Sequence, residues 1–169
     1  MSLKDSDKDF LENLNKNIPS DSKDKMKRLM ESWQVKIEEK ADPNKIIIVI
    51  KSVKEAMSYD KKEFTVTAGK TVELIFENPD AMQHNLVIGK PKSLEIIGKA
   101  ANKMITQKDA IQKNYIPNIS QIIASTPLVN PESSYRLTFT APEQVGDYPY
   151  ICTFPGHWSI MNGVMKVVK

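Results

Sequence analysis

The chain has 169 residues but only one cysteine, Cys152, and two histidines, His84 and His157. One cysteine excludes an intrachain disulfide and a four-cysteine zinc site. Two histidines are too few for a multinuclear, histidine-rich metal centre. Charge of one sign is also scarce: the net charge is +3 and no run of lysine or arginine forms a binding arm. This charge pattern argues against a nucleic-acid partner.

Long apolar runs are missing as well. The run Ile46–Ile50 has five residues, whereas a membrane-spanning helix needs about 20. The first residues lack the basic and then apolar pattern of a secretory signal. We therefore expect no membrane span, and either a cytoplasmic chain or a mature or excised piece of an exported parent. The composition, 40% hydrophobic and 27% charged, is typical of a globular domain.

The first 44 residues have helical patterns. One apolar stripe contains Phe10, Leu11, Leu14 and Ile18, and the stretch Pro19–Ser22 separates it from a second stripe. The second stripe has the same helical spacing: Met26, Leu29, Met30, Trp33 and Ile37. We predict an N-terminal helical extension over residues 1–44 whose apolar side chains pack against the main domain.

From Lys45 onward the pattern changes to short strands separated by turns that contain proline or glycine. The β-branched run Ile46–Ile50 is typical of a core strand, and Thr71–Glu77 alternates apolar and polar side chains. Further strands are predicted at 64–67, 85–88, 135–140, 146–152 and 163–168. Several short strands with regular turns indicate an antiparallel sandwich or barrel over residues 45–169.

An insertion at residues 90–130 interrupts these strands. Its first half predicts a helix with four apolar side chains on one face: Leu94, Ile97, Ala101 and Ile105. Its second half, 115–127, indicates irregular loop. A connection of this length in a compact β domain usually serves a function, for example as cover for a site. The predicted fold class is mainly β, a sandwich with an N-terminal helical extension and a helical insertion.

The side chains with metal-binding chemistry gather at one place in this predicted fold. Cys152, His157 and Met161 lie on one loop between two predicted strands, and His84 begins the strand after the turn at 78–80. A thiolate, two imidazoles and a weak thioether are the ligand set of a blue-copper site. Thiolate and thioether favour Cu(I) whereas imidazole suits Cu(II), so this set serves both states with little rearrangement.

Each of these residues has a simpler interpretation when it is taken alone. A single buried cysteine is usually an inert small apolar residue, and Met161 could be a core side chain. His84 could be a strand histidine whose hydrogen bonds are satisfied. Together they favour a metal site, because every cysteine and histidine of the chain falls in this one group.

The sequence around these residues resembles the cupredoxins, and most of all their azurin and auracyanin branch. The loop Cys152–His157 reads Cys-Thr-Phe-Pro-Gly-His and is followed by Met161, and His84-Asn85 matches the earlier ligand strand. The resemblance covers residues 45–169 and implies a Greek-key, cupredoxin-like β-sandwich. It also implies one copper ion that cycles between Cu(I) and Cu(II), and a non-enzymatic role in one-electron transfer to a redox protein or haem domain.

The resemblance implies roles for individual residues. His84, Cys152 and His157 would bind the copper in one plane, with Met161 axial. The backbone carbonyl of Gln83, at a position that is glycine in azurins, would be a distant oxygen on the opposite side.

Further residues would surround these ligands. Asn85 and the backbone amide of Phe154 would donate hydrogen bonds to the thiolate, and Asn85 would brace the ligand loop. Electrons would pass through an apolar patch at the edge of His157 that is shaped by Pro155, Trp158 and Met82. Alternatively, Trp158 packs against the 90–130 insertion.

Two other function classes stay open. An enzyme would need a second copper centre, for which no histidine remains, or a nucleophile whose base is placed by a third group, which the Cys152–His157 loop lacks. A non-catalytic binding or structural role, as the C-terminal module of a larger multidomain redox protein with copper secondary, fits the predicted helices at the N-terminus. The resemblance favours a periplasmic or extracellular parent.

Overall fold

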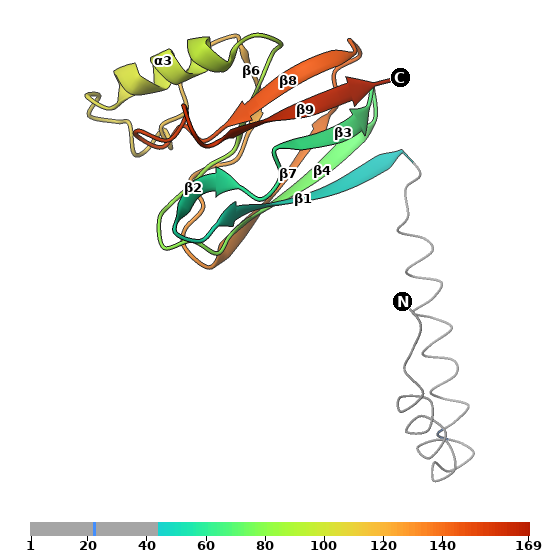
Figure 1. Ribbon diagram of the computed structural model, residues 1–169, viewed down its shortest axis with the longest axis horizontal. Coiled ribbons are helices and arrows are strands. Elements are labelled where there is room, and N and C mark those ends of the chain that lie inside the picture. Colours follow the sequence, from blue (N-terminus) through green and yellow to red (C-terminus); the bar gives the residue numbers. More distant parts are fainter. Residues whose placement is uncertain (1–21, 23–43) are drawn as a thin grey trace. The chain divides into compact units, whose positions relative to one another are not determined.

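The computed structural model describes residues 44–169 and the single residue Ser22. The predicted helical extension at 1–44 therefore lies outside the described residues, apart from its end and Ser22, and the proposed domain division stays a prediction. Residues 44–169 contain nine strands and one helix, arranged as two packed sheets (Figure 1). No helix among the described residues is both long enough and apolar enough to cross a membrane.

The first sheet has the strand order β2-β1-β4-β7. Its strands are β1 (Lys45–Val53), β2 (Ala56–Tyr59), β4 (Thr71–Asn78) and β7 (Ser133–Thr140). β1 alternates between the two faces of this sheet, because successive side chains in a strand point to opposite sides. Ile46, Ile48 and Ile50 pack in the core, whereas Ile47 is exposed.

The second sheet has the strand order β3-β9-β8-β5-β6. Its strands are β3 (Glu63–Thr67), β9 (Asn162–Val168), β8 (Gly146–Ile151), β5 (Val87–Gly89) and β6 (Ile122–Ser125). The main core lies between the two sheets. Its largest fully buried side chains include Phe76, Leu74, Tyr150, Met161 and Met165.

This architecture confirms the predicted β-sandwich but corrects the predicted pairing. Antiparallel pairing throughout was wrong, because β1 pairs parallel with β4 and β3 pairs parallel with β9. The chain crosses to the second sheet as β3 before it returns to the first as β4, so the strands on either side of the crossing need not be antiparallel. The predicted irregular loop at 115–127 was also wrong in part, since it contains β6, which pairs with β5.

Helix α3 (Leu94–Met104) covers the outer face of the second sheet (Figure 1). Ile97 packs there with Val87 of β5 and Ile151 of β8. Both faces of β5, and of β8 from Tyr148 to Ile151, are therefore buried. The predicted helix is confirmed, but Ile105 follows its last residue and is exposed, and Met104 is buried in its place.

Strand register brings the ends of β5, β8 and β9 together. Val87 lies opposite Ile151, and Ile151 lies opposite Asn162. One residue beyond, the N–H of Cys152 donates to the carbonyl of Met161 at 3.0 Å. The sequence predicted that His84 begins β5. Instead, His84 lies three residues before the start of β5 and forms an isolated β-bridge with Val129.

Candidate metal centre

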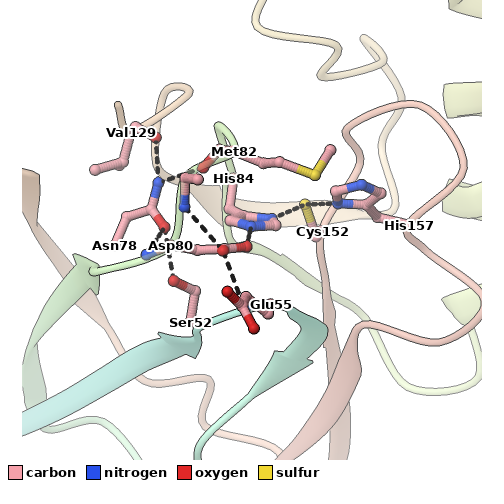
Figure 2. Close-up of polar contacts among 10 residues, drawn as sticks. Ser52, Glu55, Asn78, Asp80, Met82, His84, Val129, Cys152 and His157 are labelled. Carbon is pink, nitrogen blue, oxygen red and sulfur yellow. Dashed lines mark hydrogen bonds and ion pairs between the residues drawn. The ribbon is translucent and has the colours of Figure 1, made fainter. Parts of the chain in front are cut away.

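Three side chains that can bind a metal ion converge at this end of the sandwich. Sγ of Cys152 lies 3.8 Å from Nδ1 of His84 and 3.6 Å from Nδ1 of His157 (Figure 2). One ligand atom from each residue lies within 4.8 Å of the other two. His84 and Cys152 are fully buried and His157 is 2% exposed. The sequence predicted these three residues as the equatorial ligands, and the structure brings them together.

These separations fit a metal ion held between the three atoms. Bonds of about 2.3 Å to sulfur and about 2.0 Å to nitrogen, at 120° to each other, place the two donor atoms about 3.7 Å apart. The observed sulfur–nitrogen distances are 3.8 and 3.6 Å. One soft thiolate with two imidazoles in a trigonal arrangement is the donor set of a blue-copper site. The residues present therefore fit a copper ion.

The protonation chemistry of the site depends on its burial. The pKa of the Cys152 thiol is raised to about 11, because the effect of burial outweighs that of the hydrogen bonds from the backbone N–H groups of Asn85 and Phe154, which lower it. These are the two thiolate donors that the family resemblance implies. Burial and the nearby His84 lower the pKa of His157, which favours the neutral imidazole that binds metals.

Asn85 ties the ligand loop to its neighbours through its side chain. Its Oδ1 accepts from the N–H of Thr153 at 2.8 Å, and its Nδ2 donates to Oγ1 of the same threonine at 2.8 Å. Nδ2 also donates to the carbonyl of Asn114 in the insertion at 2.8 Å. Asn85 thus fastens the residue after Cys152 to both the β5 segment and the insertion.

Asp80 contacts the site although sequence reasoning assigned it only to a turn. Its Oδ2 lies 2.8 Å from Nε2 of His84, on the side of the ring away from Cys152 (Figure 2). An acidic residue four positions before a proposed ligand histidine was the available signal, since ligand histidines commonly donate to a carboxylate.

Asn78 holds the segment that carries Asp80 and His84. Its Oδ1 accepts from Oγ of Ser52 at 2.6 Å, and its Nδ2 donates to the carbonyls of Met82 and Val129 at 2.8 and 2.9 Å. The backbone of His84 is fixed in turn by its bridge to Val129. The segment from 78 to 84 is therefore held at both ends.

Comparison with known proteins identifies the family. The sequence model of the family described as "Copper binding proteins, plastocyanin/azurin family" matches residues 46–168. The chain belongs to this family. Its cofactor is therefore copper, one ion per domain, and electron transfer is the general role that membership implies.

Individual relatives agree with this family. Auracyanin-A of Chloroflexus aurantiacus is 41% identical over 124 residues, which are 72% of this chain and 74% of that protein. Azurin-1 of Alcaligenes xylosoxydans xylosoxydans is 30% identical over 123 residues, which are 68% of this chain and 92% of that protein.

Solved structures show the same fold. The structure of auracyanin A, described as a "blue" copper protein, has a TM-score of 0.66 and 40% identity over 73% of this chain and 99% of that one. Dithionite-reduced auracyanin from Roseiflexus castenholzii has a TM-score of 0.64 and 37% identity over 73% of this chain and 97% of that one.

Two more residues of this cupredoxin were expected near the metal. Met161 is fully buried, and its N–H donates to the carbonyl of His157 at 2.8 Å. Its backbone is thus tied to two of the candidate ligands, Cys152 and His157. The side chain of Gln83 donates to Oδ1 of Asn130, and an axial role for its carbonyl stays a prediction.

The residues of the expected apolar patch differ in exposure. Met82 is 44% exposed, Pro155 and Trp158 are half-buried, and His157 is almost covered. The ring of Phe154 lies 5.0 Å from that of His157 between centroids.

Trp158 also packs against the insertion. The indole lies beside Gly98 of α3, and its Nε1 donates to Oδ1 of Asn102 at 3.2 Å. This contact is the alternative that the sequence left open for Trp158, and it leaves the tryptophan half-exposed.

Proposed function

We propose that this protein is a mononuclear blue-copper carrier that transfers one electron at a time to a docked redox partner. His84, Cys152 and His157 are the equatorial copper ligands, and Met161 is the axial ligand. The observation that carries the proposal is the burial of all three equatorial ligands in one trigonal group, at 0%, 0% and 2% exposure. A catalytic metal site keeps a position open for substrate, whereas an electron carrier needs none.

The protein around the ligands keeps their geometry constant. When bound, copper supplies a centre that alternates between Cu(I) and Cu(II). Asn85 fastens Thr153 beside Cys152, and the bridge between His84 and Val129 fixes the other ligand segment. Held in this way, the side chains have little freedom to rearrange between the two oxidation states, which favours rapid electron transfer.

Electrons enter and leave at the end of the sandwich near His157. His157 is 2% exposed, and two exposed apolar side chains lie near the ligands in sequence: Ile160 at 51% and Met82 at 44% exposure. With Pro155 and Trp158 these side chains make an apolar docking patch. Exposed apolar groups of this kind mark protein interaction sites. The partner is a redox protein or haem domain, and we place both outside the cytosol, in the periplasm or at the cell surface.

The insertion adds a charge preference to this docking patch. Residues 90–130 contain six lysines and only two acidic residues, Glu95 and Asp109. Lys99 and Lys103 lie on α3, the helix against which Trp158 packs. Because opposite charges steer diffusing partners together, the docking partner should present acidic side chains around its own redox centre.

Addition of Cu(II) to the metal-free, full-length chain tests the proposal. We expect an intense blue absorption that saturates at one copper per chain, is bleached by ascorbate, and is absent in Cys152→Ser. Met165→Leu is the matched control, because Met165 is fully buried on β9 but is not a proposed ligand. A colourless Cu(II) complex of the intact chain would refute the proposal. Zinc must be removed first, since it occupies such sites without colour.

A further inference from the structure

Asp80 and Cys152 contact opposite sides of the His84 ring. Nε2 of His84 lies 2.8 Å from Oδ2 of Asp80, whereas Nδ1 faces Sγ of Cys152 at 3.8 Å (Figure 2). A neutral imidazole carries its hydrogen on one nitrogen only, and a metal binds the other. The group at Nε2 therefore decides whether Nδ1 is free to bind the metal.

When Nε2 of His84 carries the hydrogen, all three contacts of Asp80 need an acceptor, which suits a carboxylate rather than an amide. Its Oδ1 accepts from the backbone N–H groups of Ala81 at 2.8 Å and Glu55 at 3.1 Å, while Oδ2 faces His84. Both oxygens thus act as acceptors. An asparagine has a single acceptor oxygen. It would therefore leave either the imidazole N–H or the two backbone N–H groups without an acceptor.

The negative charge of Asp80 has little compensation within the protein. The side chain is 5% exposed, and among residues 44–169 the one titratable side chain that contacts its carboxylate is His84, which carries no charge as a neutral imidazole. A buried carboxylate is costly unless a cation balances it. A metal ion on the far side of the His84 ring is such a cation.

We propose that Asp80 is a positioning residue for the copper centre. Its carboxylate holds His84 in the tautomer with hydrogen on Nε2, so that Nδ1 is presented to the metal, and its charge favours Cu(II) over Cu(I). This inference rests on the proposed role of His84 as a copper ligand, and it assigns to Asp80 a function beyond the folding of the turn.

The parent protein provides the first test. In the full-length, nitrogen-15-labelled chain loaded with Cu(I), NMR should detect a hydrogen on Nε2 of His84 that exchanges slowly with water. Slow exchange follows from its burial and its hydrogen bond to Asp80. A missing hydrogen on Nε2, or exchange as fast as that of an exposed imidazole, overturns the proposal without any variant.

The second test compares Asp80→Asn with Asp147→Asn. Asp147 is exposed near the start of β8, at the end of the strand away from Cys152, so its substitution removes the same charge from a remote place. We expect Asp80→Asn to weaken Cu(II) binding about 10- to 100-fold, to shift the reduction potential to more positive values, and to speed exchange at Nε2. Asp147→Asn should change none of these by a comparable amount.

The outcomes separate this inference from the proposed function. If the parent chain gives no blue Cu(II) complex, the proposed function fails. If the parent is blue but Asp80→Asn keeps the parent's potential, affinity and exchange rate and loses only stability, Asp80 is merely structural and the inference alone is overturned. Should Asp80→Asn fail to fold, the exchange measurement on the parent decides.

Discussion

Alanine at position 98 tests whether α3 braces the copper-ligand loop. A Cβ on Gly98 would lie 2.2 Å from Cδ2 and 2.3 Å from Cε3 of Trp158. These atoms lie in the middle of the indole, so the whole ring must move rather than its tip. Because Trp158 directly follows His157, the displacement would reach the ligand loop.

Two effects of Gly98→Ala oppose each other. Alanine in place of glycine inside a helix stabilises it by about 0.8–1 kcal/mol. Overpacking of a filled contact costs about 1–3 kcal/mol. The free energy of unfolding should therefore fall by roughly 0–2 kcal/mol in the parent. In the Trp158→Ala background the obstructing ring is gone, so Gly98→Ala should raise the free energy of unfolding by about 0.8–1 kcal/mol.

Urea denaturation of the metal-free, full-length chain, followed by circular dichroism, measures all four variants of this cycle. We expect a coupling energy of about 1–3 kcal/mol between the two sites. Ala100→Gly, on the same helix, is the control. It should lower the free energy of unfolding by about 0.8–1 kcal/mol both in the parent and in Trp158→Ala. If Gly98→Ala stabilises the parent as much as it stabilises Trp158→Ala, the contact between helix and ligand loop is refuted.

Three further predictions concern the ligand loop and the docking patch. Asn85→Ala should lower the free energy of unfolding in urea by about 1–3 kcal/mol, because it leaves the buried N–H of Thr153 without an acceptor; an unchanged midpoint would contradict this. Met161→Leu should keep the blue colour but raise the reduction potential, whereas the equally buried Met165→Leu should not; equal potentials would rule out an axial Met161. Added salt should slow oxidation of the reduced protein by anionic ferricyanide, and Lys103→Glu should weaken this salt dependence in stopped-flow measurements. A salt effect of opposite sign would contradict a basic docking surface.

The candidate metal ligands could be proposed from the sequence because most of the information is local. Cys152, His157 and Met161 lie within ten residues of one another, on a loop whose flanking strands have clear patterns. His84 is distant in sequence, and it was identified because the chain has no other spare histidine and because His84-Asn85 matches the earlier ligand strand of the resembling family. The structure then brings it to Cys152 through strand pairing between β5 and β8.

Other features depend on contacts between distant segments and could not be predicted in this way. β6 has only four residues, Ile122–Ser125, and it is defined by its pairing with β5, a contact between distant segments. The parallel pairing of β1 with β4 depends on a crossing between sheets. Asp80 looked like an ordinary turn residue, because its spacing of four residues from His84 is a weak signal and its contact with Nε2 of His84 appears only in the fold.

Redox titration of the copper-loaded, full-length chain tests the central claim most directly. The proposed single copper centre should accept and release one electron per chain, reversibly, at one midpoint potential. The blue absorption should appear and disappear in step with that transition. An irreversible transition, more than one electron per chain, or a blue band that does not follow the potential would contradict a mononuclear electron carrier.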